Sequence, residues 1–374
     1  MLIQKKLFLN TPVSDSSLTG VAEKITNHTR LDSFDAKLIL NSSDIHLIGA
    51  MAEYKKKVKS GNLIYFTVNK HINYTNVCRV HCQVCAFKRG KHASDAYVLD
   101  IDHIINSLKL YGDNLDEVHI VGGLNPDLPF DYYISMIKII KTNFPGITVK
   151  AFTATEINFF ASLYKTTIHD VLSKLLDAGL DTMPGGGAEM LSDHIRAMLF
   201  KGKEQKDVWL ETHRTAHSLG IKTNATMLYG HIETDDDIIN HLEELRKLQD
   251  QTYGFLTFVP LVFHPDNTPM YRKVRTPSAI RKLKIIALSR LYLDNFPHIK
   301  AYWVMLSEGI TQIALHFGAD DIDGTIGEEK VTHAAGAKTP YGLAKDKMVN
   351  IIKDAGYVPA QRDGIYKIIK LYDK

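Results

Sequence analysis

Short apolar runs recur along the chain and alternate with longer amphipathic stretches. Most runs are rich in β-branched and aromatic residues, which is typical of buried strands. The stretches between them place apolar residues at helical spacing, most clearly over residues 132–144, 168–179 and 236–250. Gly179 stands at the end of the second stretch, where a glycine commonly ends a helix. This alternation predicts an α/β protein with a parallel sheet.

The runs number eight when a weak last one is included. They cover residues 64–68, 117–121, 148–152, 180–183, 223–229, 255–263, 301–306 and 320–323. Eight strands favour a closed (βα)8 barrel of the TIM type over an open sheet. We therefore expect a barrel over residues 56–325, between a helical N-terminal extension (1–55) and a C-terminal extension (326–374) that packs on the barrel.

Polar or glycine-rich segments follow the first six predicted strands. The active site of such a barrel lies at the carboxyl ends of its strands, so these segments would gather at one rim. In chain order they read NYTNVCRVHCQVC, GGLNPDLP, TATE, PGGGAE, GHIE and HPDNTP. Their coincidence at one rim indicates a functional site there more strongly than any single loop does.

The composition is that of an ordinary globular protein, with 45% hydrophobic and 23% charged residues among 374. A formal net charge of +3 is too small to indicate a nucleic acid or a membrane surface as partner. No run approaches the roughly 18 apolar residues of a membrane span, and residues 1–17 contain no signal-peptide core. We expect a cytoplasmic protein that acts on a small molecule.

All cysteines of the chain lie in the first rim segment: they are Cys78, Cys82 and Cys85. A disulfide scaffold is therefore excluded, and a metal site in a reduced protein is indicated. Zinc would need a fourth ligand from His71, His81 or His92, at irregular spacing. A [4Fe–4S] cluster held by three thiolates leaves one iron open. S-adenosylmethionine can chelate that iron through its amino and carboxylate groups.

The C-x3-C-x2-C spacing after a first barrel strand resembles the radical S-adenosylmethionine superfamily. The resemblance implies a [4Fe–4S] cluster on these cysteines, S-adenosylmethionine as co-substrate, a radical SAM TIM-type barrel and a flavodoxin- or ferredoxin-type electron donor. Two positions depart from the usual pattern. Val84 replaces an aromatic residue beside the adenine, and Leu124 replaces an acidic residue. Phe87 is expected to supply part of the missing apolar surface.

Longer segments resemble one family within the superfamily, the aminofutalosine (aminodeoxyfutalosine) synthases of the futalosine route to menaquinone. The segments are residues 71–78, 85–87, 121–133, 151–157, 183–190, 209–233 and 333–340. The implied reaction adds the 5′-deoxyadenosyl radical to the enol ether of 3-[(1-carboxyvinyl)oxy]benzoate. Its products are 6-amino-6-deoxyfutalosine, methionine and bicarbonate.

Other functions share parts of this pattern. The cyclic dehypoxanthinylfutalosine synthases and the deazaflavin-forming synthases use related motifs, and a non-catalytic iron–sulfur protein is the alternative from another class. Glycine-rich loops at six strand ends argue against the last, because a scaffold role does not need them.

Candidate cofactor contacts follow from the rim and from the resemblance. They are Phe87, Gly122, Gly123, Glu156, Gly185, Gly186, Gly187 and Glu189. The glycines let the backbone approach a ligand closely and leave its N–H groups bare. A carboxylate at a helix N-terminus, as at Glu156, can instead serve the helix dipole.

The two carboxylates of the implied substrate require cations or hydrogen-bond donors. Candidate substrate contacts at the rim are Arg79, His231, Glu233 and His264. Arg214 is a weaker candidate because its helical stretch can equally present it to solvent. His71 and Asn73, before the cysteines, are expected to support the cluster from outside its ligand shell.

Overall fold

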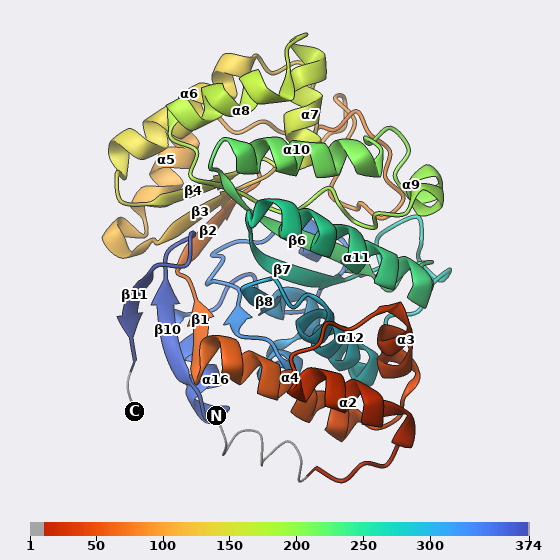
Figure 1. Cartoon of the computed structure of the whole chain (residues 1–374). Helices are drawn as coiled ribbons and strands as arrows, with labels where there is room; N and C mark the ends of the chain where they lie inside the picture. Colours follow the sequence, from red (N-terminus) through yellow and green to blue (C-terminus); the bar gives the residue numbers. More distant parts are fainter. Residues whose placement is uncertain (1–10, 373–374) are drawn as a thin grey trace.

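The computed structural model describes residues 11–372, and its core is a curled, mainly parallel sheet (Figure 1). The predicted α/β barrel of the TIM type is confirmed. The strand order is β11-β10-β1-β9-β8-β7-β6-β5-β4-β3-β2. The strands are β1 (Leu63–Phe66), β2 (Asn69–Ile72), β3 (Glu117–Ile120), β4 (Thr148–Ala151), β5 (Thr182–Met183), β6 (Lys222–Tyr229), β7 (Phe255–Val262), β8 (His298–Ala301), β9 (Asp321–Ile322), β10 (Val358–Arg362) and β11 (Ile368–Leu371).

Helices cover the outside of this sheet, and the three predicted from periodicity are confirmed as α6, α8 and α11. The helices are α2 (Thr19–Thr26), α3 (Ser33–Asn41), α4 (Ile45–Ser60), α5 (Ile101–Lys109), α6 (Phe130–Asn143), α7 (Ala154–Leu163), α8 (Ile168–Ala178), α9 (Asp193–Leu199), α10 (Lys206–Ser218), α11 (Asp235–Thr252), α12 (Ala279–Tyr292), α13 (Trp303–Leu306), α14 (Glu308–Ala314), α15 (Val331–Ala334) and α16 (Lys345–Asp354). Short 3-10 turns are η1 (Ser16–Leu18), η2 (Gly112–Asn114) and η3 (Leu315–Phe317). Among the described residues, no helix is long and apolar enough to cross a membrane.

The barrel closes through a bent segment made of β1 and β2. β1 pairs with β9 and β10, whereas β2 pairs with β3. At the bend, a carboxylate oxygen of Asp116 accepts a hydrogen bond from the Val68 backbone N–H at 2.7 Å. The strand expected over residues 64–68 is therefore β1, which ends at Phe66, and the second strand β2 at Asn69–Ile72 was not predicted.

The chain after β9 completes the closure. The His71 N–H donates to the Ile326 carbonyl at 2.9 Å, and the Thr325 N–H donates to the Thr67 carbonyl at 3.2 Å. Asn69, fully buried, accepts from the Ile326 N–H at 2.7 Å through its side chain. The first and last strands of the barrel are thus joined by backbone and side chain together.

The predicted strand over residues 301–306 is wrong. The strand is β8, which ends at Ala301, and Trp303–Leu306 forms the short helix α13. Trp303, Val304 and Leu306 are all buried, so the apolar run is correctly inside. A short apolar run does not distinguish a buried strand from a buried helical turn, which is why the prediction failed.

The chain before β1 and the chain after residue 326 lie outside the central strands and pack at two different places. The helices α2, α3 and α4 precede β1 and lie together at one end of the molecule (Figure 1). The first ten residues of the expected N-terminal extension lie outside the described residues. After residue 326 the chain forms α15, α16 and two more strands, and β10 continues the sheet beside β1.

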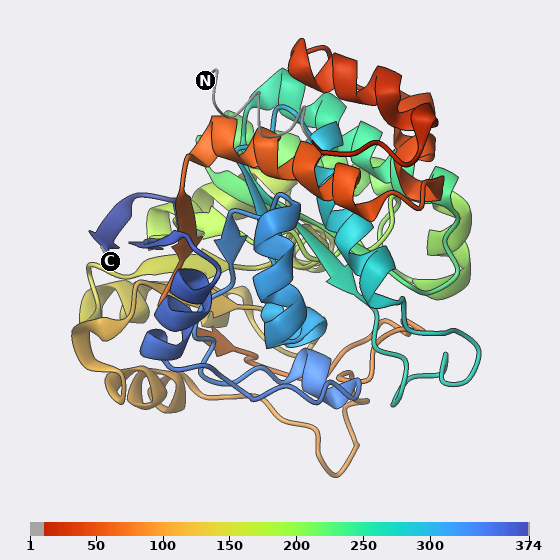
Figure 2. The ribbon, with the colours of Figure 1, turned by 90° about the horizontal axis from the view of Figure 1, so that it is seen from below.

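The strand-end loops lie on the side away from the N-terminal helices. Figure 2 shows the loop after β2 (orange), the loop after β7 (teal) and the segment after β9 (blue) on this side. The last two are linked, because the Asn267 side chain donates to the Ala334 carbonyl at 2.9 Å. The molecule therefore brings distant parts of the sequence to one mouth of the barrel.

We predict that Asn69→Ala lowers the free energy of unfolding by about 1–3 kcal/mol, because it leaves the buried N–H of Ile326 unpaired. Urea unfolding of the full chain measures this. Asn62→Ala is the matched control, since Asn62 is exposed and its amide lies 3.5 Å from its acceptor. We expect the control to change stability by no more than about 0.5 kcal/mol. Equal losses in the two variants would contradict the closure described here.

Candidate active site

The three cysteines stand on a loop that its own hydrogen bonds hold in place. The Cys78 N–H donates to the Arg89 carbonyl at 3.0 Å, and the Arg89 N–H donates to the Asn76 carbonyl at 2.7 Å. The Asn76 side chain donates to the Asp95 carbonyl at 2.8 Å and accepts from the Tyr97 N–H at 2.8 Å. We call residues 73–100 the cluster loop. These hydrogen bonds connect the two arms of the loop.

The end of β3 supports the cluster loop through backbone contacts. The Gly123 N–H donates to the Thr75 carbonyl at 2.9 Å, and the Arg79 N–H donates to the Leu124 carbonyl at 3.0 Å. A Cβ on Gly123 would stand 2.2 Å from the Val77 carbonyl oxygen. The glycine is thus required for the loop to pack on the strand, in addition to the ligand approach expected from the sequence.

The predicted residues converge on a cavity of about 280 Å³ between the cluster loop and the strand ends, here called the outer pocket. All three cysteines line it. Of the other candidates it brings together Phe87, Gly122, Gly123, Glu156, Gly186, Gly187, Glu189 and His264, while Gly185 lines the adjoining cavity described below. Val84 and Leu124, the two departures from the usual pattern, also line the outer pocket and make its wall apolar.

Burial controls the protonation of the thiols. Desolvation raises the pKa of Cys82 to about 11 and also raises the pKa of Cys85. In the metal-free protein these groups are therefore neutral near pH 7, and binding a metal must release their protons. Among the described residues, no group of three His, Cys, Asp or Glu side chains is arranged to hold a single ion.

The donor set fits a cluster better than it fits zinc. Three thiols from one loop face one cavity, as a cluster with three protein ligands and one open iron needs. The histidines considered for zinc are dispersed. His71 lines another cavity, His81 contacts Lys88 at 3.3 Å, and His92 is exposed. The cluster would therefore be held by Cys78, Cys82 and Cys85.

The glycine-rich loop after β5 is fixed by an arginine that the sequence did not single out. Buried Arg196 on α9 donates to the Ala188 carbonyl at 2.7 Å and to the Glu204 carbonyl at 2.6 Å. Gly187 has a φ of +89°, and a Cβ there would meet the Thr155 hydroxyl at 2.1 Å. Arg196 thus orients a bare backbone segment toward the outer pocket.

A buried ion pair lies beside the cysteines. The Lys203 ammonium donates to Glu189 at 2.5 Å, and both residues line the outer pocket. Burial alone would lower the pKa of Lys203, but Glu189 and Cys82 outweigh it and raise the pKa. Lys203 therefore stays charged. Sequence reasoning did not select Lys203, because this residue follows the short helix α9 rather than a strand.

Glu156 joins the ends of three neighbouring strands. One carboxylate oxygen accepts from the Tyr74 hydroxyl at 2.8 Å and from the Gly122 N–H at 3.1 Å. The other accepts from the Thr153 N–H and hydroxyl, both at 2.8 Å. Burial raises the pKa of Glu156 to about 7. All four hydrogen-bonding positions are used within the protein, so Glu156 holds the rim together at the wall of the outer pocket.

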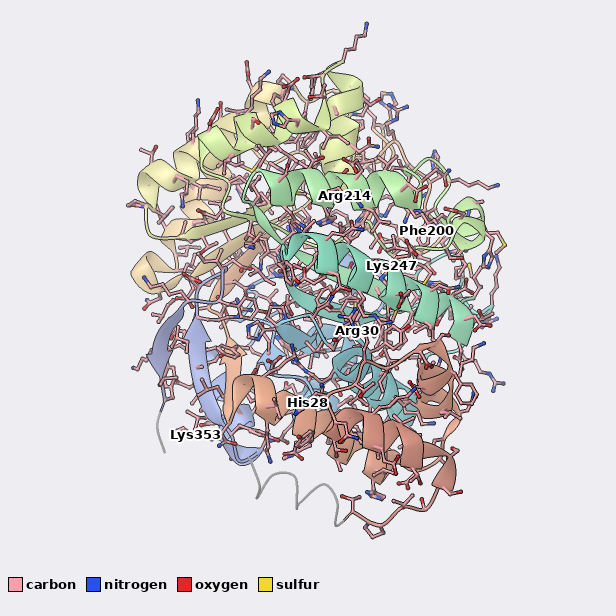
Figure 3. The ribbon with its side chains drawn as sticks, viewed as in Figure 1. His28, Arg30, Phe200, Arg214, Lys247 and Lys353 are labelled. Atoms are coloured by element: carbon pink, nitrogen blue, oxygen red, sulfur yellow. The ribbon has the colours of Figure 1, made fainter. Side chains whose placement is uncertain are left out.

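Four other candidates line neither the outer pocket nor the second cavity described next. They are Arg79, Arg214, His231 and Glu233. Glu233 accepts from the N–H groups of Gly230 and His231, at 2.6 and 2.8 Å, and so stabilises a turn after β6. Arg79 lies over the Phe159 ring, 6.0 Å from its centre. Arg214 points outward from α10 (Figure 3) and pairs with Glu211 at 2.6 Å.

A second cavity of about 210 Å³, the inner chamber, continues from the outer pocket into the barrel. The two share lining residues, among them Asn73, Gly186, Leu261 and Met305. The chamber is lined by His71, His119, Lys150, Asn224, Lys300, Asp323 and Glu329, together with apolar side chains. Apart from His71, the sequence did not select these residues, because most lie within strands and Glu329 lies just before α15.

Comparisons with known proteins agree with this arrangement. Residues 72–245 match the Radical SAM superfamily, and residues 252–374 match the CofH/MqnC C-terminal region. The chain is 40% identical over 366 residues to the aminodeoxyfutalosine synthase of Thermus thermophilus, covering 97% of this chain and 98% of that enzyme. Methylornithine synthase shares the fold, with a TM-score of 0.73, 18% identity and coverage of 90% of this chain and 96% of that one.

Two relatives with other names are also similar. The 5-amino-6-(D-ribitylamino)uracil–L-tyrosine 4-hydroxyphenyl transferase of Methanopyrus kandleri is 38% identical, over 94% of this chain and 96% of its own. The cyclic dehypoxanthine futalosine synthase of Halalkalibacterium halodurans is 35% identical, over 96% of each chain.

We predict that Gly123→Ala reduces the iron bound after anaerobic reconstitution, because the new Cβ displaces the Val77 carbonyl and with it Cys78. Gly90→Ala is the control on the same loop, since a Cβ at Gly90 meets no atom within 4 Å. Iron and sulfide assays with the visible spectrum measure the effect. A Gly123→Ala protein that binds as much iron as the control would show that the loop does not depend on this contact.

Proposed function

The chain belongs to the radical S-adenosylmethionine enzymes, in the family that includes the aminodeoxyfutalosine synthases, and we propose that it is itself such a synthase. Its cofactors are a [4Fe–4S] cluster and S-adenosylmethionine. We propose that it joins the 5′-deoxyadenosyl group of S-adenosylmethionine to 3-[(1-carboxyvinyl)oxy]benzoate. The products would be 6-amino-6-deoxyfutalosine, methionine and bicarbonate, formed for menaquinone biosynthesis.

The observation that carries this proposal is 40% identity maintained over nearly the full length of both chains. It includes the C-terminal region, where residues 333–340 resemble the synthases. The relatives with the two other activities are 38% and 35% identical, so they define the alternatives. Residues 119–130 and 151–157 favour the synthase among them.

The chain supplies the positions in which this chemistry can occur. Cys78, Cys82 and Cys85 would hold the cluster at the mouth of the barrel. When bound, the cluster and S-adenosylmethionine provide the 5′-deoxyadenosyl radical. The Glu189 carboxylate and the backbone carbonyls at Gly122 and Gly123 would bind polar groups of S-adenosylmethionine in the outer pocket.

The segment after β9 shields the same space from water. Val331 and Thr332 line both cavities, so α15 lies over their junction. The Thr339 hydroxyl donates to the Val304 carbonyl at 2.9 Å and fixes the following turn to α13. Exclusion of water protects a reactive radical from side reactions. We propose that residues 331–339 serve as this cover.

An external reductant must supply the electron, and we propose a flavodoxin- or ferredoxin-type donor. The cluster loop supports this proposal, because it exposes Lys91, which is paired with Asp127 at 2.7 Å, and His92 beside it. Basic side chains near the cluster would attract an acidic partner and raise the rate of encounter.

The fate of the adenosyl carbons distinguishes the proposed reaction from hydrogen abstraction. We predict that S-adenosylmethionine labelled with ¹³C in its adenosyl group, with dithionite and 3-[(1-carboxyvinyl)oxy]benzoate, gives a labelled nucleoside–benzoate adduct and an equal amount of methionine. Addition keeps the adenosyl carbons in the product, and mass spectrometry detects them. Free 5′-deoxyadenosine should be a minor product.

Stoichiometric 5′-deoxyadenosine with an unlabelled main product would contradict the proposal. The same assay with dehypoxanthinylfutalosine in place of the enol ether tests the cyclising reaction. Turnover of that compound alone would assign the chain to the second activity of the family.

A further inference from the structure

The inner chamber contains polar atoms that no protein group satisfies. The Nε2 atom of His71 and the Oδ1 atom of Asn224 are buried without a hydrogen-bond partner among the described residues. His119 lies beside His71, with ring centres 4.6 Å apart. Within residues 11–372 its ring nitrogens have no hydrogen bond either. Buried polar groups are normally paired, so these point to a ligand that enters the chamber.

The charged groups of the chamber are already neutralised. Lys150 donates to Glu117 at 2.6 Å, and Lys300 donates to Asp323 at 3.1 Å. Glu329 accepts from the N–H groups at the start of α15. The two imidazoles are therefore available as donors to a ligand, whereas the two lysines of the chamber are already paired.

The two histidines present their side chains to the same side of the sheet. His71 on β2 is paired in register with His119 on β3, and His119 is paired with Lys150 on β4. All three line the chamber. Lys150, although paired with Glu117, lies next to the two rings, and the carboxylates of Asp323 and Glu329 also act on His71. An anion bound between the rings would therefore lie close to a buried cation.

Apolar side chains line much of the chamber, among them Val121, Val259, Leu261, Met305 and Val331. Four of these residues, Val121, Leu261, Met305 and Val331, also line the outer pocket, so the wall leads from the cluster loop into the lumen. A ligand that extends from the outer pocket into the inner chamber would have an apolar, flat middle and an anionic inner end.

We propose that His71 and His119 bind the ring carboxylate of the aryl enol ether substrate, so that its double bond points toward the outer pocket. This inference rests on the proposed function for the identity of the substrate. The double bond must lie beside S-adenosylmethionine to react, which leaves the benzoate end for the closed part of the chamber. The aromatic ring would then contact Val259 and Leu261.

The protonation state of the histidines is compatible with this role. Burial lowers the pKa of His71 and lowers that of His119 well below its ordinary value. Each ring is therefore neutral near pH 7 in the empty chamber and carries one N–H that can donate to a carboxylate oxygen. An arriving anion raises the pKa of a neighbouring imidazole and strengthens the contact.

The test compares two ligands that differ only in the ring carboxylate. These are 3-[(1-carboxyvinyl)oxy]benzoate and 2-phenoxyacrylate, and their affinities for the reconstituted enzyme with S-adenosylmethionine are measured by calorimetry. The native protein should prefer the first by about tenfold or more, as expected for hydrogen bonds to a charged group. In His71→Ala and in His119→Ala the preference should fall to about threefold or less, and His→Asn variants should recover part of it.

His213→Ala is the matched control, because His213 is buried on α10 outside the chamber. Control and test variants should bind equal amounts of iron and S-adenosylmethionine. Variants at His71 and His119 that keep the native preference would overturn the inference, as would a native protein that binds neither compound. If the native protein shows the preference but forms no aminodeoxyfutalosine, the proposed function fails while the carboxylate site stands.

Discussion

The close approach of the cluster loop to the end of β3 is the constraint on which the site depends. The Val77 carbonyl occupies the place where a side chain on Gly123 would stand, and the Tyr74 ring occupies the corresponding place beside Gly122, 2.6 Å from an added Cβ. Only bare backbone allows this contact. Because the loop rests there, its three cysteines face the barrel mouth, and the outer pocket forms beneath them.

A second constraint follows from filling a barrel lumen with charge. Lys150, Glu117, Lys300 and Asp323 are all buried, and each would be costly to hold alone. They occur as pairs, Lys150 with Glu117 and Lys300 with Asp323, so these four charges balance one another. The unpaired atoms of His71 and Asn224 belong to neutral side chains, which cost less to bury than charges do. The chamber can therefore bind an anionic ligand without holding an isolated buried cation.

Much of the fold and the mouth of the site could be predicted from the sequence, because local patterns encode them. The cysteine spacing, the glycines at strand ends and the helical periodicities each depend on neighbouring residues. The contents of the lumen could not be predicted in this way. Whether His119 or Asn224 faces inward depends on the register and tilt of the strands, which arise only when the barrel closes. Closure itself uses Thr325 and Ile326, which carry no sequence signal.

Some rim residues were also beyond sequence reasoning. His231 and Glu233 follow a strand in the expected place, yet Glu233 uses its carboxylate to close the turn that contains both. Conversely, Arg196 and Lys203 come from α9 and the segment after it, and they reach the site only through the packing of that segment. Position along the chain indicates which loops meet at the mouth, but side-chain direction decides which residues enter it.

The central claim is that S-adenosylmethionine binds in the outer pocket and that the aryl enol ether binds in the inner chamber. An anaerobic crystal structure of the reconstituted protein with S-adenosylmethionine and 3-[(1-carboxyvinyl)oxy]benzoate tests it most directly. The account predicts the ring carboxylate beside His71 and His119 and the double bond facing the outer pocket. A substrate bound the other way round, with its benzoate beside the cluster loop, or bound outside the lumen, would contradict it.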